Sequence, residues 1–141
     1  MRDWRATMPP KKGTRPWIPV PIAWEGVRVS ENGRRLLVAY VTSNGQPVDR
    51  ADARWDQRRL TLTLSRMGAG EGGGTALFHH CVEVPVSQDA STRVLIDGAT
   101  GERANAKRST YLDPEQLRQR EQPPDAYFEP TERLEPREVS T

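Results

Sequence analysis

The chain contains 141 residues, of which 35% are hydrophobic and 28% are charged, with 11 glycines, 12 prolines and a formal net charge of +2. This length supports one compact domain of ordinary size, and the low apolar content indicates that part of the chain lies outside the core. The longest unbroken apolar run covers only residues 36–41, whereas a membrane span needs about 18–20 residues. The basic N-terminus lacks the apolar stretch of a secretory signal. We therefore expect a cytoplasmic protein with no membrane partner.

Charge is distributed unevenly along the sequence. Residues 1–15 have five basic side chains and one acidic side chain, a net charge of +4. Residues 16–104 have ten of each sign, residues 105–120 have a net charge of +2, and the last 21 residues have six acids and two arginines, a net of −4. This balanced centre offers no obvious wide basic surface. The composition divides the chain into a basic arm rich in Pro and Trp (1–23), a β-domain (24–104) and a charged region containing one short helix (105–141).

The N-terminal arm is shaped by proline. Five prolines lie between positions 9 and 21. Each fixes φ and removes a backbone donor, so this segment forms neither a helix nor a central strand. An extended, polyproline-like conformation is expected.

The first two strands of the β-domain are predicted on either side of a turn. Residues 26–30 favour a strand, and Asn32-Gly33 after them supplies the positive φ angles of a tight hairpin. Residues 35–42 are apolar on both faces and rich in strand formers, which predicts the central and most buried strand.

The segment from residue 48 to residue 55 has two interpretations. Its alanines and Trp55 alternate with charged residues as on a strand, but Asp49, Asp52 and Asp56 would also share one face of a helix. We favour a strand, because residues 59–65 alternate faultlessly between apolar and polar and would pair with it across a short turn at 56–58. The aspartates are interleaved with arginines, so we expect ion pairs on a solvated face rather than acid–base catalysis.

Two further strands complete the predicted sheets. Residues 75–86 exceed the usual strand length, which predicts a bulge or a bend, and residues 92–97 form a shorter strand. The stretch 68–74 is rich in glycine and is interpreted as a flexible hairpin connection. A short helix is expected over residues 113–121, and a tail that cannot offset its ordering entropy from residue 122 onward. The fold class is therefore all-β: a small antiparallel sandwich or partly open barrel of five to seven strands, with an extended N-terminal arm and a short C-terminal helix plus tail.

The order of these elements resembles that of small uncharacterised β-domain proteins of actinobacterial type. The similarity covers about residues 36–101 and depends on the final strand and turn, which read Val-Leu-Ile-Asp-Gly-Ala-Thr-Gly at positions 94–101. It implies a β fold and no activity. Relatives of this kind often have a second cysteine near the position of residues 44–47, which implies a disulfide in an exported form. This chain has no cysteine there.

His79, His80 and Cys81 form the only cluster of potential metal ligands or nucleophiles of this kind. On a strand His79 and Cys81 share one face and His80 lies on the other, so at most two of them can reach one metal ion. We expect Cys81 to pack as a small hydrophobe beside a partly exposed histidine. The sequence therefore favours a protein with no metal, no cofactor and no enzymatic activity, and a metal-dependent enzyme or metal carrier that uses His79 and Cys81 is the third hypothesis.

We expect a non-enzymatic interaction or assembly module whose extended ends contact partner subunits. The segment at residues 17–22 suits docking on a sheet of its own chain, of a second copy or of a partner. The candidate partner-binding residues are the aromatic and aliphatic side chains of the two ends: Trp4, Trp17, Ile18, Tyr127 and Phe128. The alternative is a nucleic-acid-associated accessory protein that uses the cations of the arm, since cations with interspersed aromatics suit phosphates and bases. Those cations are Arg2, Arg5, Lys11, Lys12 and Arg15.

Overall fold

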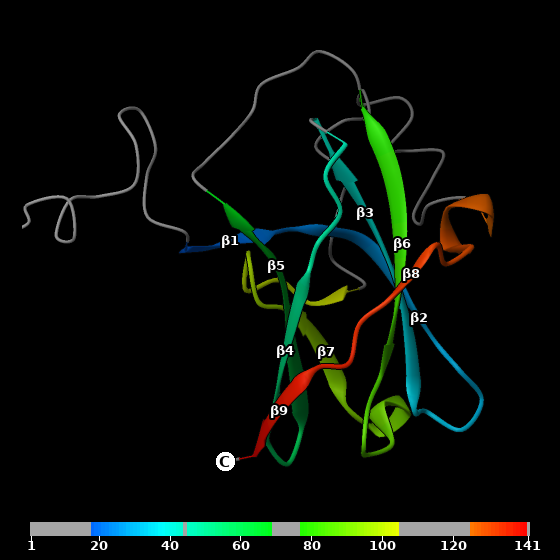
Figure 1. The fold of residues 1–141 in the computed structure, drawn as a ribbon. Helices are drawn as coiled ribbons and strands as arrows, with labels where there is room; N and C mark the ends of the chain where they lie inside the picture. Colours follow the sequence, from blue (N-terminus) through cyan, green and yellow to red (C-terminus); the bar gives the residue numbers. More distant parts are fainter. Residues whose placement is uncertain (1–17, 44, 69–76, 105–124, 141) are drawn as a thin grey trace, which may run out of the picture.

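A computed structural model describes residues 18–43, 45–68, 77–104 and 125–140 of the chain. These residues form two mixed β-sheets that are not closed into a barrel (Figure 1). The strands are β1 (Ile18–Ile22), β2 (Trp24–Val29), β3 (Arg35–Thr42), β4 (Arg50–Trp55), β5 (Arg59–Gly68), β6 (Phe78–Pro85), β7 (Val94–Asp97), β8 (Glu132–Arg133) and β9 (Arg137–Ser140). Two short 3₁₀ segments, η2 (Ala90–Thr92) and η4 (Asp125–Phe128), accompany them.

The two sheets share one core. The five-stranded sheet has the order β1-β5-β4-β9, with β7 also paired to β5, and the four-stranded sheet has the order β2-β3-β6-β8. Alternate residues of each strand point inward, as the period of two requires. The largest side chains that they bury fully are Trp55, Tyr40, Leu36, Leu60, Leu62 and Leu64.

A single residue connects the two sheets near the N-terminal end of the described chain. Only Ala23 separates β1 from β2, and the chain passes from one sheet to the other at this point (Figure 1). The register of β2 against β3 shifts between Trp24 and Gly26, which is how a strand bends from one sheet into another. The Trp24 indole N–H donates to the Leu62 carbonyl of the other sheet, at 3.3 Å.

The end of β7 reinforces this junction. Asp97 is fully buried, and its Oδ2 accepts the backbone N–H of Trp24 at 2.9 Å. Its Oδ1 accepts the N–H of Ala99, also at 2.9 Å, within the turn that follows. Gly98 lies so close to Thr63 that an added Cβ would fall 1.7 Å from the threonine Oγ1. The turn predicted at residues 97–101 therefore connects β7, a strand of the five-stranded sheet, to β2 of the four-stranded sheet.

The local predictions for the central strands are confirmed. β3 lies between β2 and β6 and is the most buried strand, and Gly33 has the positive φ of 73° that its hairpin requires. Residues 50–55 form a strand that pairs with β5, as expected, and Trp55 is registered with Leu60, so the hairpin is one residue tighter than the predicted turn at 56–58. β1 tolerates two prolines because it lies at a sheet edge, where prolines two positions apart remove donors from one side only.

The sheets differ from the predicted antiparallel arrangement of five to seven strands. Nine strands are present in the described residues, and β7, β8 and β9 are each parallel to a partner. Of the predicted strand at 75–86, the described part β6 keeps one continuous register with β3 and ends at Pro85, where a bend was one of the two expectations. The glycine-rich stretch after β5 does not join a hairpin, because β5 and β6 belong to different sheets.

Strand structure also extends on both sides of residues 24–104. β1 precedes this range, and β8 and β9 follow it. The expectation of an unfolded tail after residue 122 is wrong for residues 125–140, because backbone pairing and a few specific side-chain contacts hold them on the sheets. The helix expected at 113–121 lies outside the described residues. None of the described residues belongs to a helix with the length and apolarity of a membrane span.

Replacing Asp97 tests the junction between the sheets. We expect Asp97→Ala to lower the free energy of unfolding by about 2–4 kcal/mol, since two backbone donors lose their charged acceptor. Asp97→Asn retains one acceptor oxygen and should lower the free energy of unfolding by a smaller amount. Urea denaturation measures both. The matched control is Glu31→Ala at an exposed hairpin position, which should change the stability by less than about 0.5 kcal/mol; equal effects of Asp97→Ala and Glu31→Ala would contradict this role of the carboxylate.

Candidate functional site

The C-terminal segment, residues 125–140, passes from the four-stranded to the five-stranded sheet (orange and red in Figure 1). It begins with η4, which packs against β3 and β6. The ring of Phe128 is buried, and the guanidinium carbon of Arg28 lies 4.2 Å from its centroid. Tyr127 stacks on His79 with 4.2 Å between ring centroids. Both predicted aromatic residues therefore contact the protein's own four-stranded sheet.

A buried hydroxyl fixes the middle of the C-terminal segment. Tyr40 donates its O–H to Glu132 Oε1 at 2.7 Å and accepts the backbone N–H of Val48 at 2.9 Å. Burial, followed by the bond to Glu132, raises the pKa of Tyr40 well above its ordinary value, so this hydroxyl stays protonated. The contact brings together residues 92 positions apart in the sequence.

Two side chains fix β9 on the five-stranded sheet. Glu138 Oε1 accepts the indole N–H of Trp55 at 2.8 Å and the N–H and O–H of Ser87 at 3.1 and 3.0 Å. Arg137 pairs with Asp52 of β4 at 3.0 Å. These contacts, with the parallel pairing of β4 and β9, attach the end of the chain without a continuous apolar face.

The remaining predicted partner-binding residues do not form one site with Tyr127 and Phe128. Ile18 lies on β1 with 56% of its surface exposed, and β1 pairs with β5 of its own chain. Trp4, Trp17 and the five basic residues of the arm lie outside the described residues. Val139, on β9, is 47% exposed. The four-residue stretch around it was too short to predict as a strand.

The His79-His80-Cys81 cluster is divided between two faces of β6, as its sequence predicts. His80 stacks on Tyr40 at 4.8 Å on the core side, and its Nε2 lies 2.8 Å from Thr42 Oγ1. Cys81 is registered with Ala39 on the opposite side and is 2% exposed. Burial, with smaller contributions from Glu132 and Glu83, raises the pKa of the thiol to about 11. Among the described residues, no three His, Cys, Asp or Glu side chains form a group that could hold a metal ion.

The solvent-facing side of the five-stranded sheet carries a group of arginines. Two shallow hollows lie on this side, with volumes of about 810 and 420 Å³, and both are lined by Asp56 and Arg59. We call this surface the arginine face and define it by the charged side chains that line the two hollows: Asp52, Arg54, Asp56, Arg58, Arg59, Arg103 and Arg137.

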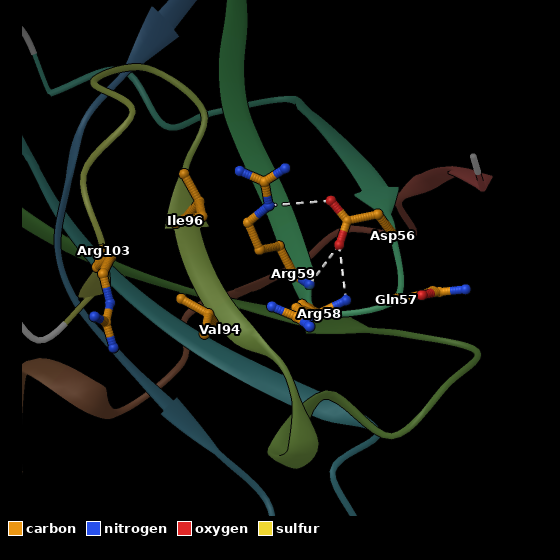
Figure 2. Close-up of a pocket in the computed structure, with 7 residues that line it drawn as sticks. All are labelled: Asp56, Gln57, Arg58, Arg59, Val94, Ile96 and Arg103. Atoms are coloured by element: carbon orange, nitrogen blue, oxygen red, sulfur yellow. Dashed lines mark hydrogen bonds and ion pairs between the residues drawn. The ribbon is translucent and has the colours of Figure 1, made fainter.

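Strand alternation and register explain how the arginine face forms. β5 is paired with β4 on one side and with β7 on the other, and Thr61 is registered with both Arg54 and Ile96. In Figure 2 the side chains of Val94 and Ile96 lie between Arg103 and the neighbouring Arg58 and Arg59. Arginine side chains thus lie on both sides of two aliphatic side chains. Arginines that acidic residues balance along the sequence are thus gathered on one side of this sheet.

The two aspartates of the arginine face are occupied by ion pairs, as predicted. Asp56 Oδ2 pairs with Arg59 Nε at 3.0 Å, and Asp52 pairs with Arg50 and Arg137, each at 3.0 Å. The pKa of Asp56 is lowered, chiefly by the backbone N–H groups of Arg58 and Arg59. Within the described part of the chain, the guanidinium groups of Arg54, Arg58 and Arg103 form no ion pair.

Comparison with known proteins gives no family for this chain. No protein-family model matches the sequence, and neither the curated proteins nor the solved structures contain a match. The resemblance of residues 36–101 to small actinobacterial β-domain proteins thus stays a hypothesis.

The reactivity of Cys81 tests whether its thiol is buried and inert, as the structure indicates. With a pKa of about 11, only about one thiol in a thousand is ionised at pH 8. We expect the folded protein to react with Ellman's reagent at least about a hundredfold more slowly than the urea-unfolded protein, because ionisation and access are both restricted. Cys81 is the only cysteine in the sequence, so the measured rate belongs to this thiol alone. Rapid reaction of the folded protein would show an activated thiol instead.

Titration of His80 should make stability depend on pH. Burial lowers the pKa of His80 below its ordinary value of 6.5, with His79 acting in the same direction and Glu132 in the opposite one. The unfolded chain therefore binds this proton at higher pH than the folded chain, and the free energy of unfolding should fall as pH decreases from about 7.5 to about 5.5. His80→Gln removes the titrating ring and should show a smaller decrease in urea denaturation. Equal decreases in the two proteins would exclude His80 as the source.

Proposed function

We propose that this protein is a non-enzymatic interaction module that assembles with a second copy of itself through its extended terminal segments. The observation that supports the proposal is the path of the C-terminal segment, which adds β8 to one sheet and β9 to the other. Adding an extended segment to a sheet edge is a common way for proteins to bind peptides. Here the bound segment belongs to the chain itself.

The contacts of this segment suit exchange between copies. Phe128, Glu132 and Glu138 are its main anchors, and each contacts residues that precede position 105. Residues 105–124 connect the two parts, and a segment of that length reaches about 66 Å when fully extended. A second copy offers the same anchor sites, so exchange retains every contact, as in domain swapping.

The exposed edge of the five-stranded sheet gives a further site of contact. β9 is the last strand in the order of this sheet, and Val139 on it is exposed. At the other end of the order, β1 has prolines at positions 19 and 21, which hinder strand addition. We therefore favour the β9 side for contact between copies.

The alternative function, a nucleic-acid-associated protein that uses Arg2, Arg5, Lys11, Lys12 and Arg15, also stays a proposal. The observation in its favour is the arginine face, a cationic surface separate from these residues in the sequence.

Disulfide trapping between full-length chains tests the exchange of the C-terminal segment. Arg54 and Val139 are registered partners on β4 and β9. In a Cys81→Ala background, one chain carries Arg54→Cys and the other Val139→Cys. After mixing under mild oxidation, we expect several-fold more mixed disulfide dimer than either variant forms alone, and a dimeric mass for the wild-type protein by light scattering.

The matched control pairs Arg54→Cys with Thr92→Cys, an exposed position on η2. This mixture should give only background crosslinking. A monomeric wild-type protein, together with no mixed dimer above this background, would exclude assembly by exchange.

A further inference from the structure

The arginine face has more positive charge than its own acids balance. Of the described residues, five arginines and two aspartates line its two hollows, which leaves a net charge of +3 for these side chains. The aspartates already pair with arginines, whereas Arg54, Arg58 and Arg103 have no ion pair among the described residues. Three exposed guanidinium groups are thus available to an anion.

The size of the face indicates a polyanion. It extends from Arg137 on β9 across β4 and β5 to β7. Three spacings between neighbouring strands amount to about 14 Å, which exceeds the size of one phosphate group. A ligand with several anionic groups in a row is needed to contact arginines at both ends.

We infer that the arginine face binds the sugar–phosphate backbone of a nucleic acid. Guanidinium groups bind phosphates in a planar, bidentate geometry, and the hydroxyl of Thr61 lies between the arginines as a neutral donor. The aliphatic Val94 and Ile96 form a floor between Arg103 and Arg59 (Figure 2), where sugar carbons find apolar contact. Among the residues that the structure describes, none of those lining the two hollows is aromatic, so the contacts that these residues offer are with phosphates and sugars, which carry no sequence information.

A fluorescent oligothymidylate of about 20 nucleotides is the probe, and anisotropy measured over a series of salt concentrations is the readout. The test variant of the full chain is Arg54→Gln/Arg58→Gln/Arg103→Gln. The matched control, Arg34→Gln/Arg35→Gln/Arg133→Gln, removes the same charge at exposed positions outside the arginine face. A third variant replaces the five basic residues of the arm by glutamine.

We expect the test variant to weaken binding at least about tenfold and to reduce the slope of log affinity against log salt by about 2, as the loss of three phosphate contacts predicts. The control variant should weaken binding by less than about threefold, since distant charges are screened. Circular dichroism confirms that each variant is folded.

Three results would overturn the inference. These are no binding of the oligonucleotide by the wild-type protein at low salt, equal losses in the test and control variants, and loss of binding in the arm variant alone. Polyglutamate of equal charge is the competitor. If it displaces the oligonucleotide at equal charge concentration, the face binds acidic proteins and the inference is also wrong.

Discussion

The fold depends on a buried carboxylate between the two sheets. Asp97, at the end of β7, accepts the backbone N–H of Trp24, which is the first residue of β2. A buried charge is tolerated only when hydrogen bonds replace its lost hydration, and the N–H of Ala99 provides a second bond. Trp24 also donates its indole N–H to Leu62, so one residue of the four-stranded sheet has two bonds to the five-stranded sheet.

This junction determines which residues of β4 and β5 face the core and which face solvent. With one face of the five-stranded sheet turned toward the core, Ala51, Ala53 and Trp55 are buried, and the charged residues between them point to solvent. Because β7 pairs with β5, its aliphatic Val94 is registered with Arg59. The arginine face is thus a consequence of how the sheets are joined, and no single stretch of sequence encodes it.

The elements that could be predicted from the sequence are those stabilised by residues close together in the chain. Alternation identified the strand at residues 59–65, and the short turn before it identified the preceding segment as its hairpin partner. β8 and β9 escaped prediction because they are short, and their anchors, Glu132 and Glu138, bind partners 92 and 83 positions away. The arginine face could not be predicted either, because the residues that form it lie far apart in the sequence, from Asp52 to Arg137.

The two proposed binding properties share one strand. Arg137 and Val139 on β9 line the arginine face, and β9 also belongs to the segment proposed to exchange between copies. In an exchanged pair, each arginine face would obtain Arg137 from the other copy while keeping Arg54, Arg58 and Arg103 of its own chain. A chain with β9 displaced would lose Arg137 and free the Asp52 carboxylate from that partner, which makes the face less positive. Anion binding and exchange therefore both require β9 to be seated beside a β4 strand, whether that strand belongs to the same chain or to the other copy.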